Sequence, residues 1–99
     1  MRTFEAIVRA YGPGLARVAA SYEADRGLRE DLLQEILLAI HRALPTLRDE
    51  ASLGPFVFRI AHNRGITHAM RARDVKRRAT LDIPAEPSAT PEQQILDNE

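Results

Sequence analysis

The sequence lacks cysteine and tryptophan, and it has only three phenylalanines and two tyrosines among its 99 residues. The absence of cysteine excludes a disulfide scaffold, a thiolate metal site and a cysteine nucleophile, and it fits a reducing compartment. No apolar run approaches the ~20 residues of a membrane span, and the N-terminus lacks the apolar segment of a signal peptide. We therefore expect a cytoplasmic chain without membrane insertion.

Charge is unevenly distributed along a chain whose formal net charge is zero. Residues 59–78 hold seven basic side chains against Asp74 alone, whereas residues 79–99 hold five acidic side chains and no basic one. Such a separation is typical of a segment that binds a polyanion, followed by an acidic tail. A solvated basic helix end is the plainer interpretation, but this density of positive charge favours nucleic acid.

The length and the apolar pattern predict one small all-α domain, a bundle of three to four helices. The first helix is indicated by apolar residues at spacings of three and four from Phe4 to Tyr22. Gly12-Pro13-Gly14 interrupts this pattern, and because proline lacks an amide donor we expect a kink or a short break there. The domain is expected to span residues 1–78, followed by a flexible acidic linker over residues 79–99.

The strongest helical pattern lies between Asp31 and Leu44. We expect this helix to begin near Leu28 and to end before Pro45, because the residue that precedes a proline avoids helical geometry. The side chains expected to face the core are Leu33, Ile36, Leu37, Ile40 and Leu44, flanked by Leu32, Ala39 and Ala43. The opposite face carries polar residues around one leucine: Asp31, Gln34, Glu35, Leu38, His41 and Arg42.

Leu38 admits two interpretations. Single exposed apolar residues are common on soluble proteins, and spacing alone favours this interpretation. Alternatively, an apolar side chain inside a polar rim is the arrangement of a partner-binding surface.

Residues 45–55 are expected to form a loop, with Ser52 or Gly54 capping the next helix. Phe56–Arg73 is expected to be the last long helix, with its apolar first half buried and its basic second half projecting into solvent or onto a polyanion. Gly65 disfavours a helix by up to ~1 kcal/mol relative to alanine, so its presence suggests close helix packing.

Side chains suited to catalysis or metal binding are not arranged for either. His41, His62 and His68 lack the i,i+4 pair with an intervening glutamate that a helical zinc site uses. Asp31 and Glu35 lie on a face expected to be exposed, and no nucleophile is paired with a base. We expect no enzymatic activity, no metal and no cofactor.

The loop and the start of the last helix carry the parts of a site for single-stranded nucleic acid. Phe56 and Phe58 offer stacking surfaces, and Asn63 can read a base edge. Nearby basic and hydroxyl side chains that can contact phosphates are Arg48, Ser52, Arg59 and Arg64. Alternatively the phenylalanines belong to the core, which is the favoured interpretation for at least one of them, because a small bundle cannot expose both without cost.

Several motifs occur in an order that resembles domain 2 of bacterial sigma factors, and more narrowly the extracytoplasmic-function group of the sigma-70 family. The motifs are Asp31-Leu-Leu-Gln-Glu-Ile36, Leu44-Pro45 before a polar loop, Ala51-Ser-Leu53, and Phe56-Val-Phe-Arg-Ile-Ala-His-Asn63. The resemblance covers residues 4–78. It implies a helical domain that binds core RNA polymerase and that recognises and melts the promoter −10 element in transcription initiation.

The resemblance also implies two sets of binding residues. The residues implied to bind the clamp helices of the largest core polymerase subunit are Asp31, Gln34, Glu35, Leu38 and Arg42. The loop and the following helix would capture flipped-out bases of the non-template strand. The residues implied there are Arg48, Ser52, Phe56, Arg59, Asn63, Arg64, Arg71, Arg73, Lys76 and Arg77. An anti-sigma factor is a further expected partner.

The sequence departs from the family pattern at the end of the loop. Gly54, Pro55 and Phe56 stand where a basic residue, a threonine and a tryptophan are frequent, and Thr67 stands where an aspartate is usual. We expect a domain 2 with its linker, without the second helical domain that reads the −35 element. Two alternatives remain: a sigma-like decoy or adaptor that binds an anti-sigma protein without DNA, and a helical bundle used for dimerisation.

Overall fold

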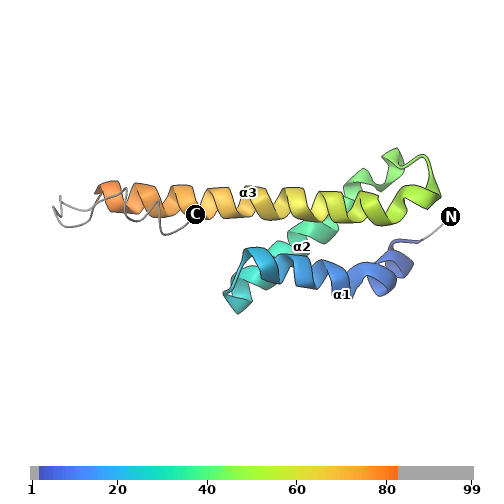
Figure 1. The fold of residues 1–99 in the computed structure, drawn as a ribbon, viewed down its shortest axis with the longest axis horizontal. Coiled ribbons are helices and arrows are strands. Elements are labelled where there is room, and N and C mark those ends of the chain that lie inside the picture. Colours follow the sequence, from blue (N-terminus) through green and yellow to red (C-terminus); the bar gives the residue numbers. More distant parts are fainter. Residues whose placement is uncertain (1–2, 83–99) are drawn as a thin grey trace.

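The computed structural model describes residues 3–82, which form three α-helices packed on one another (Figure 1). The elements are α1 (Phe4–Tyr22), α2 (Arg26–Ala43), the 3₁₀ turns η1 (Leu44–Thr46) and η2 (Glu50–Ser52), and α3 (Leu53–Asp82). This part of the chain contains no β-strand, so the predicted all-α class and number of helices are confirmed. Within it, no helix combines the length and the apolar composition that a membrane crossing requires.

α1 continues through Pro13 as a single helix, so the alternative of a break at this proline is wrong. Proline here removes the hydrogen bond to the carbonyl of Arg9, one turn earlier. Arg9 and Pro13 are both exposed, so water can solvate that carbonyl. Gly12 also has no Cβ to crowd the proline ring, which relieves the usual restriction on the preceding residue. The helix therefore accommodates the proline without ending.

α2 begins two residues before the expected Leu28 because Asp25 caps it. The Asp25 carboxylate accepts a hydrogen bond from the Leu28 amide at 2.9 Å, which satisfies one of the free donors of the first turn. The helix ends at Ala43, next to the 3₁₀ turn that contains Pro45, as the sequence predicted.

The core-facing side of α2 is centred one residue before the predicted stripe. Leu32, Ile36 and Ile40 are fully buried, whereas Leu33 and Leu37 are only partly buried at the edge of the core. Periodicity defines an apolar sector of the helix but not its deepest line. Here α2 packs against both α1 and α3, and these two neighbours decide which leucines lie deepest.

α3 begins earlier than expected, at Leu53, so it includes the last three residues of the predicted loop, and two 3₁₀ turns occupy part of the remainder. Gly54 therefore lies inside the helix rather than capping it. Pro55 lies in the first turn, where its missing amide hydrogen costs nothing because those amides have no partner within the helix.

α3 also ends later than expected, at Asp82 rather than Arg73. The predicted domain end at residue 78 thus falls inside this helix. Of the predicted linker, residues 79–82 continue α3 and the remainder lies outside the described residues. The C-terminal half of α3 extends beyond the other two helices, as predicted for the basic half (Figure 1).

The core is built by α1, α2 and the first half of α3. Its buried residues are Ile7, Leu15, Val18, Ala19, Leu32, Ile36, Ile40, Leu53, Phe56, Val57 and Ala61. Among the described residues, no buried apolar side chain of α3 lies beyond Ala61. The second half of α3 therefore adds no side chain to the core, and its backbone hydrogen bonds keep it helical.

Gly65 permits the close approach between α3 and the end of α1 that its presence suggested. It is buried, and a Cβ at this position would overlap the ring of Tyr22, whose Cγ would be 2.7 Å away. The ring is held in place because its hydroxyl lies 3.0 Å from Nδ1 of His62. The glycine therefore determines how closely the two helices pack.

Candidate functional site

The outer side of α2 gathers the residues that the sequence assigned to polymerase binding. We call Asp31, Gln34, Glu35, Leu38 and Arg42 the α2 face. They line two adjoining surface hollows that share Glu35 and Leu38. Leu38 is 48% exposed, so its predicted place opposite the core is confirmed, and both interpretations of this residue agree with its exposure. This arrangement is that of a surface with an apolar anchor.

α3 also contributes to these hollows. His68 lines the first hollow and Arg64 lines the second. Arg71 Nη1 lies 3.5 Å from Glu35 Oε2, an ion pair between partly exposed side chains. Arg64 and Arg71, which the sequence grouped with the DNA-binding residues, therefore face α2.

The solvent side of α3 carries a second set of predicted residues. At about 100° per residue, one stripe of this helix holds Arg59, Asn63, Ile66, Met70, Arg73 and Arg77, which we call the α3 outer face. All six are exposed, and Ile66 and Met70 are 48% and 61% exposed. Arginines interleaved with apolar side chains can combine phosphate contacts with packing against bases.

Ile66 and Met70 were not assigned a role from the sequence. The signal was available, because both lie three or four residues from an arginine or asparagine of the predicted set. Lys76 is exposed at the margin of this face, about 100° around the helix from Arg77.

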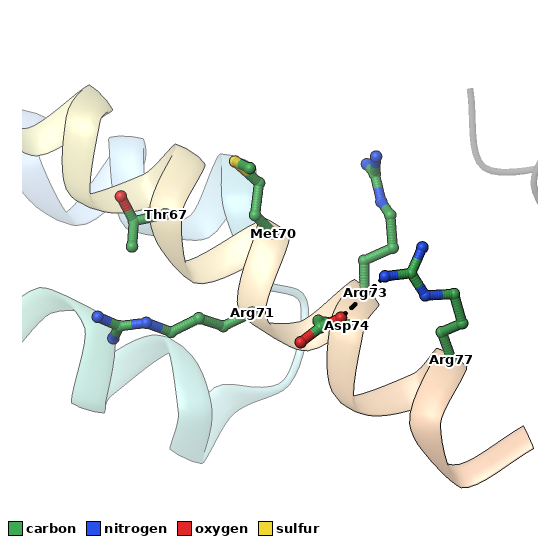
Figure 2. A pocket seen from close by; sticks show the side chains of 6 residues that line it. All are labelled: Thr67, Met70, Arg71, Arg73, Asp74 and Arg77. Carbon is green, nitrogen blue, oxygen red and sulfur yellow. Dashed lines mark hydrogen bonds and ion pairs between the residues drawn. The ribbon is translucent and has the colours of Figure 1, made fainter. Parts of the chain in front are cut away.

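Asp74 forms ion pairs with two arginines at the end of α3. Its carboxylate lies 3.0 Å from Arg77 Nη2 and 3.2 Å from Arg78 Nη2. A shallow hollow here is lined by Thr67, Met70, Arg71, Arg73, Asp74 and Arg77 (Figure 2). Figure 2 shows Arg71 extending along α2, whereas Arg73 points away from it. The arginines at the end of α3 therefore do not all point to the same side, since Arg71 faces α2 and Arg73 faces solvent.

The loop end differs from the prediction in one respect. Arg48 and Ser52 are exposed in the connection between α2 and α3, and can reach a ligand there. Phe56 is only 9% exposed and belongs to the core, because it faces α1 and α2 from the first turns of α3. Phe58 is partly buried and packs edge-to-face on Tyr11, with 5.9 Å between ring centroids. Phe56 therefore offers no free ring for stacking.

Two histidines connect α3 to the end of α1. His62 contacts Tyr22, and His68 Nε2 donates to Glu23 Oε1 at 2.7 Å. The hydrogen bond from His68, with a second from the Asp25 amide, lowers the pKa of the Glu23 carboxyl below its ordinary value. Residues 3–80 hold no cluster of three or more side chains suited to a metal ion.

Comparison with known proteins identifies one similarity. A family model described as Sigma-70 region 2 matches residues 7–75, which is more than half of the 99 residues. The match includes the entire α2 face and all of the α3 outer face except Arg77. No curated protein and no solved structure matches the chain.

Proposed function

Since this chain belongs to the sigma-70 region 2 family, which binds core RNA polymerase and takes part in promoter melting, we propose that it is domain 2 of an extracytoplasmic-function sigma factor. Its role is then to recognise the promoter −10 element once it is bound to polymerase. It acts by binding and base capture, and the chain itself makes or breaks no bond. This role places it in the cytoplasm with the polymerase.

The α2 face is the surface that we assign to the clamp helices of the largest core subunit. The observation that carries this proposal is the half-exposed Leu38, which lies in the middle of Asp31, Gln34, Glu35 and Arg42. An apolar side chain that becomes fully buried on binding, within a rim that excludes water, is the usual source of binding energy at an interface.

The α3 outer face and the preceding loop are the surface that we assign to the non-template strand at −10. Arg59 and Arg73 are available for phosphates, Arg77 can contact one with the guanidinium nitrogens that Asp74 does not bind, and Asn63 can read a base edge. Exposed Ile66 and Met70 can pack against bases taken out of the stack. Arg48, Ser52 and Lys76 lie at its margins, while the buried Phe56 is left out of this surface.

The test is binding of a labelled single strand with a −10 sequence to core polymerase loaded with the chain. We expect specific retention of the strand, weakened about 5- to 150-fold by Asn63→Ala if this side chain contributes the ~1–3 kcal/mol of a base contact. Arg9→Ala on exposed α1 serves as the matched control, with no effect expected. Polymerase binding without strand recognition would contradict the DNA assignment and favour the adaptor that binds an anti-sigma protein.

A further inference from the structure

Glu35 occupies the centre of the α2 face and is also in contact with α3. It lines both hollows of that face, and its carboxylate forms the ion pair with Arg71. Among the described residues, this is the one ion pair that joins α2 to α3. The two proposed binding surfaces therefore meet at a single pair of opposite charges.

Arg71 lies between the two surfaces. Its side chain also lines the hollow that holds Met70, Arg73 and Arg77, yet its guanidinium is turned toward α2 (Figure 2). The side chain is 64% exposed, so it is not fixed by packing and can adopt another rotamer. The Glu35 carboxylate favours its present direction, and it is the one acidic side chain that forms an ion pair with Arg71 among residues 3–80.

We propose that this pair couples the two surfaces. A partner that engages the Glu35 carboxylate releases Arg71, which then turns to the α3 outer face and binds a phosphate of single-stranded nucleic acid. The proposal rests on the function proposed above, because it takes the polymerase as the partner of Glu35. Coupling between two sites is reciprocal, so a bound strand also strengthens the hold of the α2 face on its partner.

The effect is expected to be modest. The pair is exposed, with 64% and 39% of the two side chains accessible, and exposed pairs contribute little free energy. Releasing Arg71 should therefore raise affinity for a single strand about two- to fivefold. One added phosphate contact should also steepen the dependence of log K on log salt by about 0.7.

The test measures the affinity of the full 99-residue chain for labelled oligothymidylate by fluorescence anisotropy at several salt concentrations. Glu35→Gln keeps the shape of the side chain and removes its charge, so it imitates engagement by a partner. We expect tighter binding and a steeper salt dependence than in the wild type. Removing Arg71 by Arg71→Ala should weaken binding more in the Glu35→Gln background than in the wild type.

Glu30→Gln is the matched control, because it also removes one acidic charge from α2 and breaks an exposed ion pair, that with Arg26 at 3.6 Å. It does not touch α3, so any gain it produces reports net charge alone. A Glu35→Gln gain no larger than that of Glu30→Gln, a gain that persists with Arg71→Ala, or no binding by any variant would overturn the coupling.

The coupling and the proposed function fail in different ways. Retention of core polymerase by the wild type, together with no specific gain from Glu35→Gln, would reject the coupling alone. A folded wild type that fails to bind core polymerase would reject the proposed function, and with it the identity of the partner of Glu35. Circular dichroism of each variant shows that the helices are intact.

Discussion

Ile36 and Leu38 are two residues apart on α2 but have opposite surroundings. Ile36 is fully buried, whereas Leu38 is 48% exposed. Ile36→Ala is expected to lower the free energy of unfolding by about 2–5 kcal/mol, because it leaves a cavity in the core. Leu38→Ala should change it by less than about 0.5 kcal/mol. Urea unfolding followed by circular dichroism measures both, and equal losses would show that the helix phase is wrong.

Leu37 lies less deep in the core than its spacing predicted. The pattern predicted that Leu37 lies in the core and that Leu38 lies opposite it, and the second prediction is confirmed. Leu37 is only partly buried, so Leu37→Glu is no longer expected to be as damaging as a charge at Ile36. Periodicity separates the two sides of a helix but does not resolve neighbours within one apolar sector.

Gly65→Ala should destabilise the fold even though alanine favours helices by up to ~1 kcal/mol over glycine. The added Cβ would overlap the Tyr22 ring, and the ring is held by His62. We expect a net loss of about 1–3 kcal/mol, as for overpacked cores. Gly27→Ala is the control, because its Cβ would meet only Asp25 Oδ2 at 3.5 Å. A loss for Gly27→Ala as large as that for Gly65→Ala would contradict the account.

Glu23 should make stability depend on pH in the acid range. Its pKa is lowered from the ordinary 4.5, first by the hydrogen bond from His68 and then by that from the Asp25 amide. The stabilisation is therefore fully present above pH 4.5 and is lost as the pH falls through the lower pKa of the folded chain. Glu23→Gln should flatten this fall in the urea midpoint, and an unchanged pH profile would contradict the assignment.

At the scale of elements, the sequence alone did not show which side chains of α3 face solvent and which face α2. The run of basic residues predicted polyanion binding, but not which arginines share a face with which neighbours. Arg71 and Arg73 are two residues apart on one helix, so they point in different directions. Only the position of α2 decides that Arg71 meets Glu35.

The proposed role of the α3 outer face predicts a change in the salt dependence of single-strand binding. Arg73→Ala removes a side chain of the α3 outer face, so it should reduce the slope of log K against log salt by about 0.7, the value for one phosphate contact. Arg9→Ala on α1 should leave the slope unchanged. Anisotropy titrations at four salt concentrations measure both slopes. Equal slopes in the two variants would remove Arg73 from the interface.

Helix ends were predicted less well than helix faces. Pro45 correctly marked the end of α2, because its effect is local. Asp25, Pro13 and Leu53 act through side-chain capping, solvation or packing, and so their effects depend on surroundings that the sequence alone does not reveal. The predicted linker beyond Asp82 lies outside the described residues.

At the scale of the whole molecule, one compact bundle presents two surfaces of different chemistry. The three helices all pack on one another, and α3 continues beyond them as a basic arm (Figure 1). The α2 face suits a protein partner and the α3 outer face suits nucleic acid. Because both surfaces meet at Glu35 and Arg71, binding at one is expected to affect the other.

Retention of bacterial core RNA polymerase on the immobilised chain tests whether the α2 face binds the polymerase. The wild type is compared with Leu38→Glu and with Ile66→Glu, since both side chains are 48% exposed and only Leu38 lies on the α2 face. We expect retention by the wild type and by Ile66→Glu, and its loss in a folded Leu38→Glu chain. Retention by all three, or by no folded chain, would contradict this assignment.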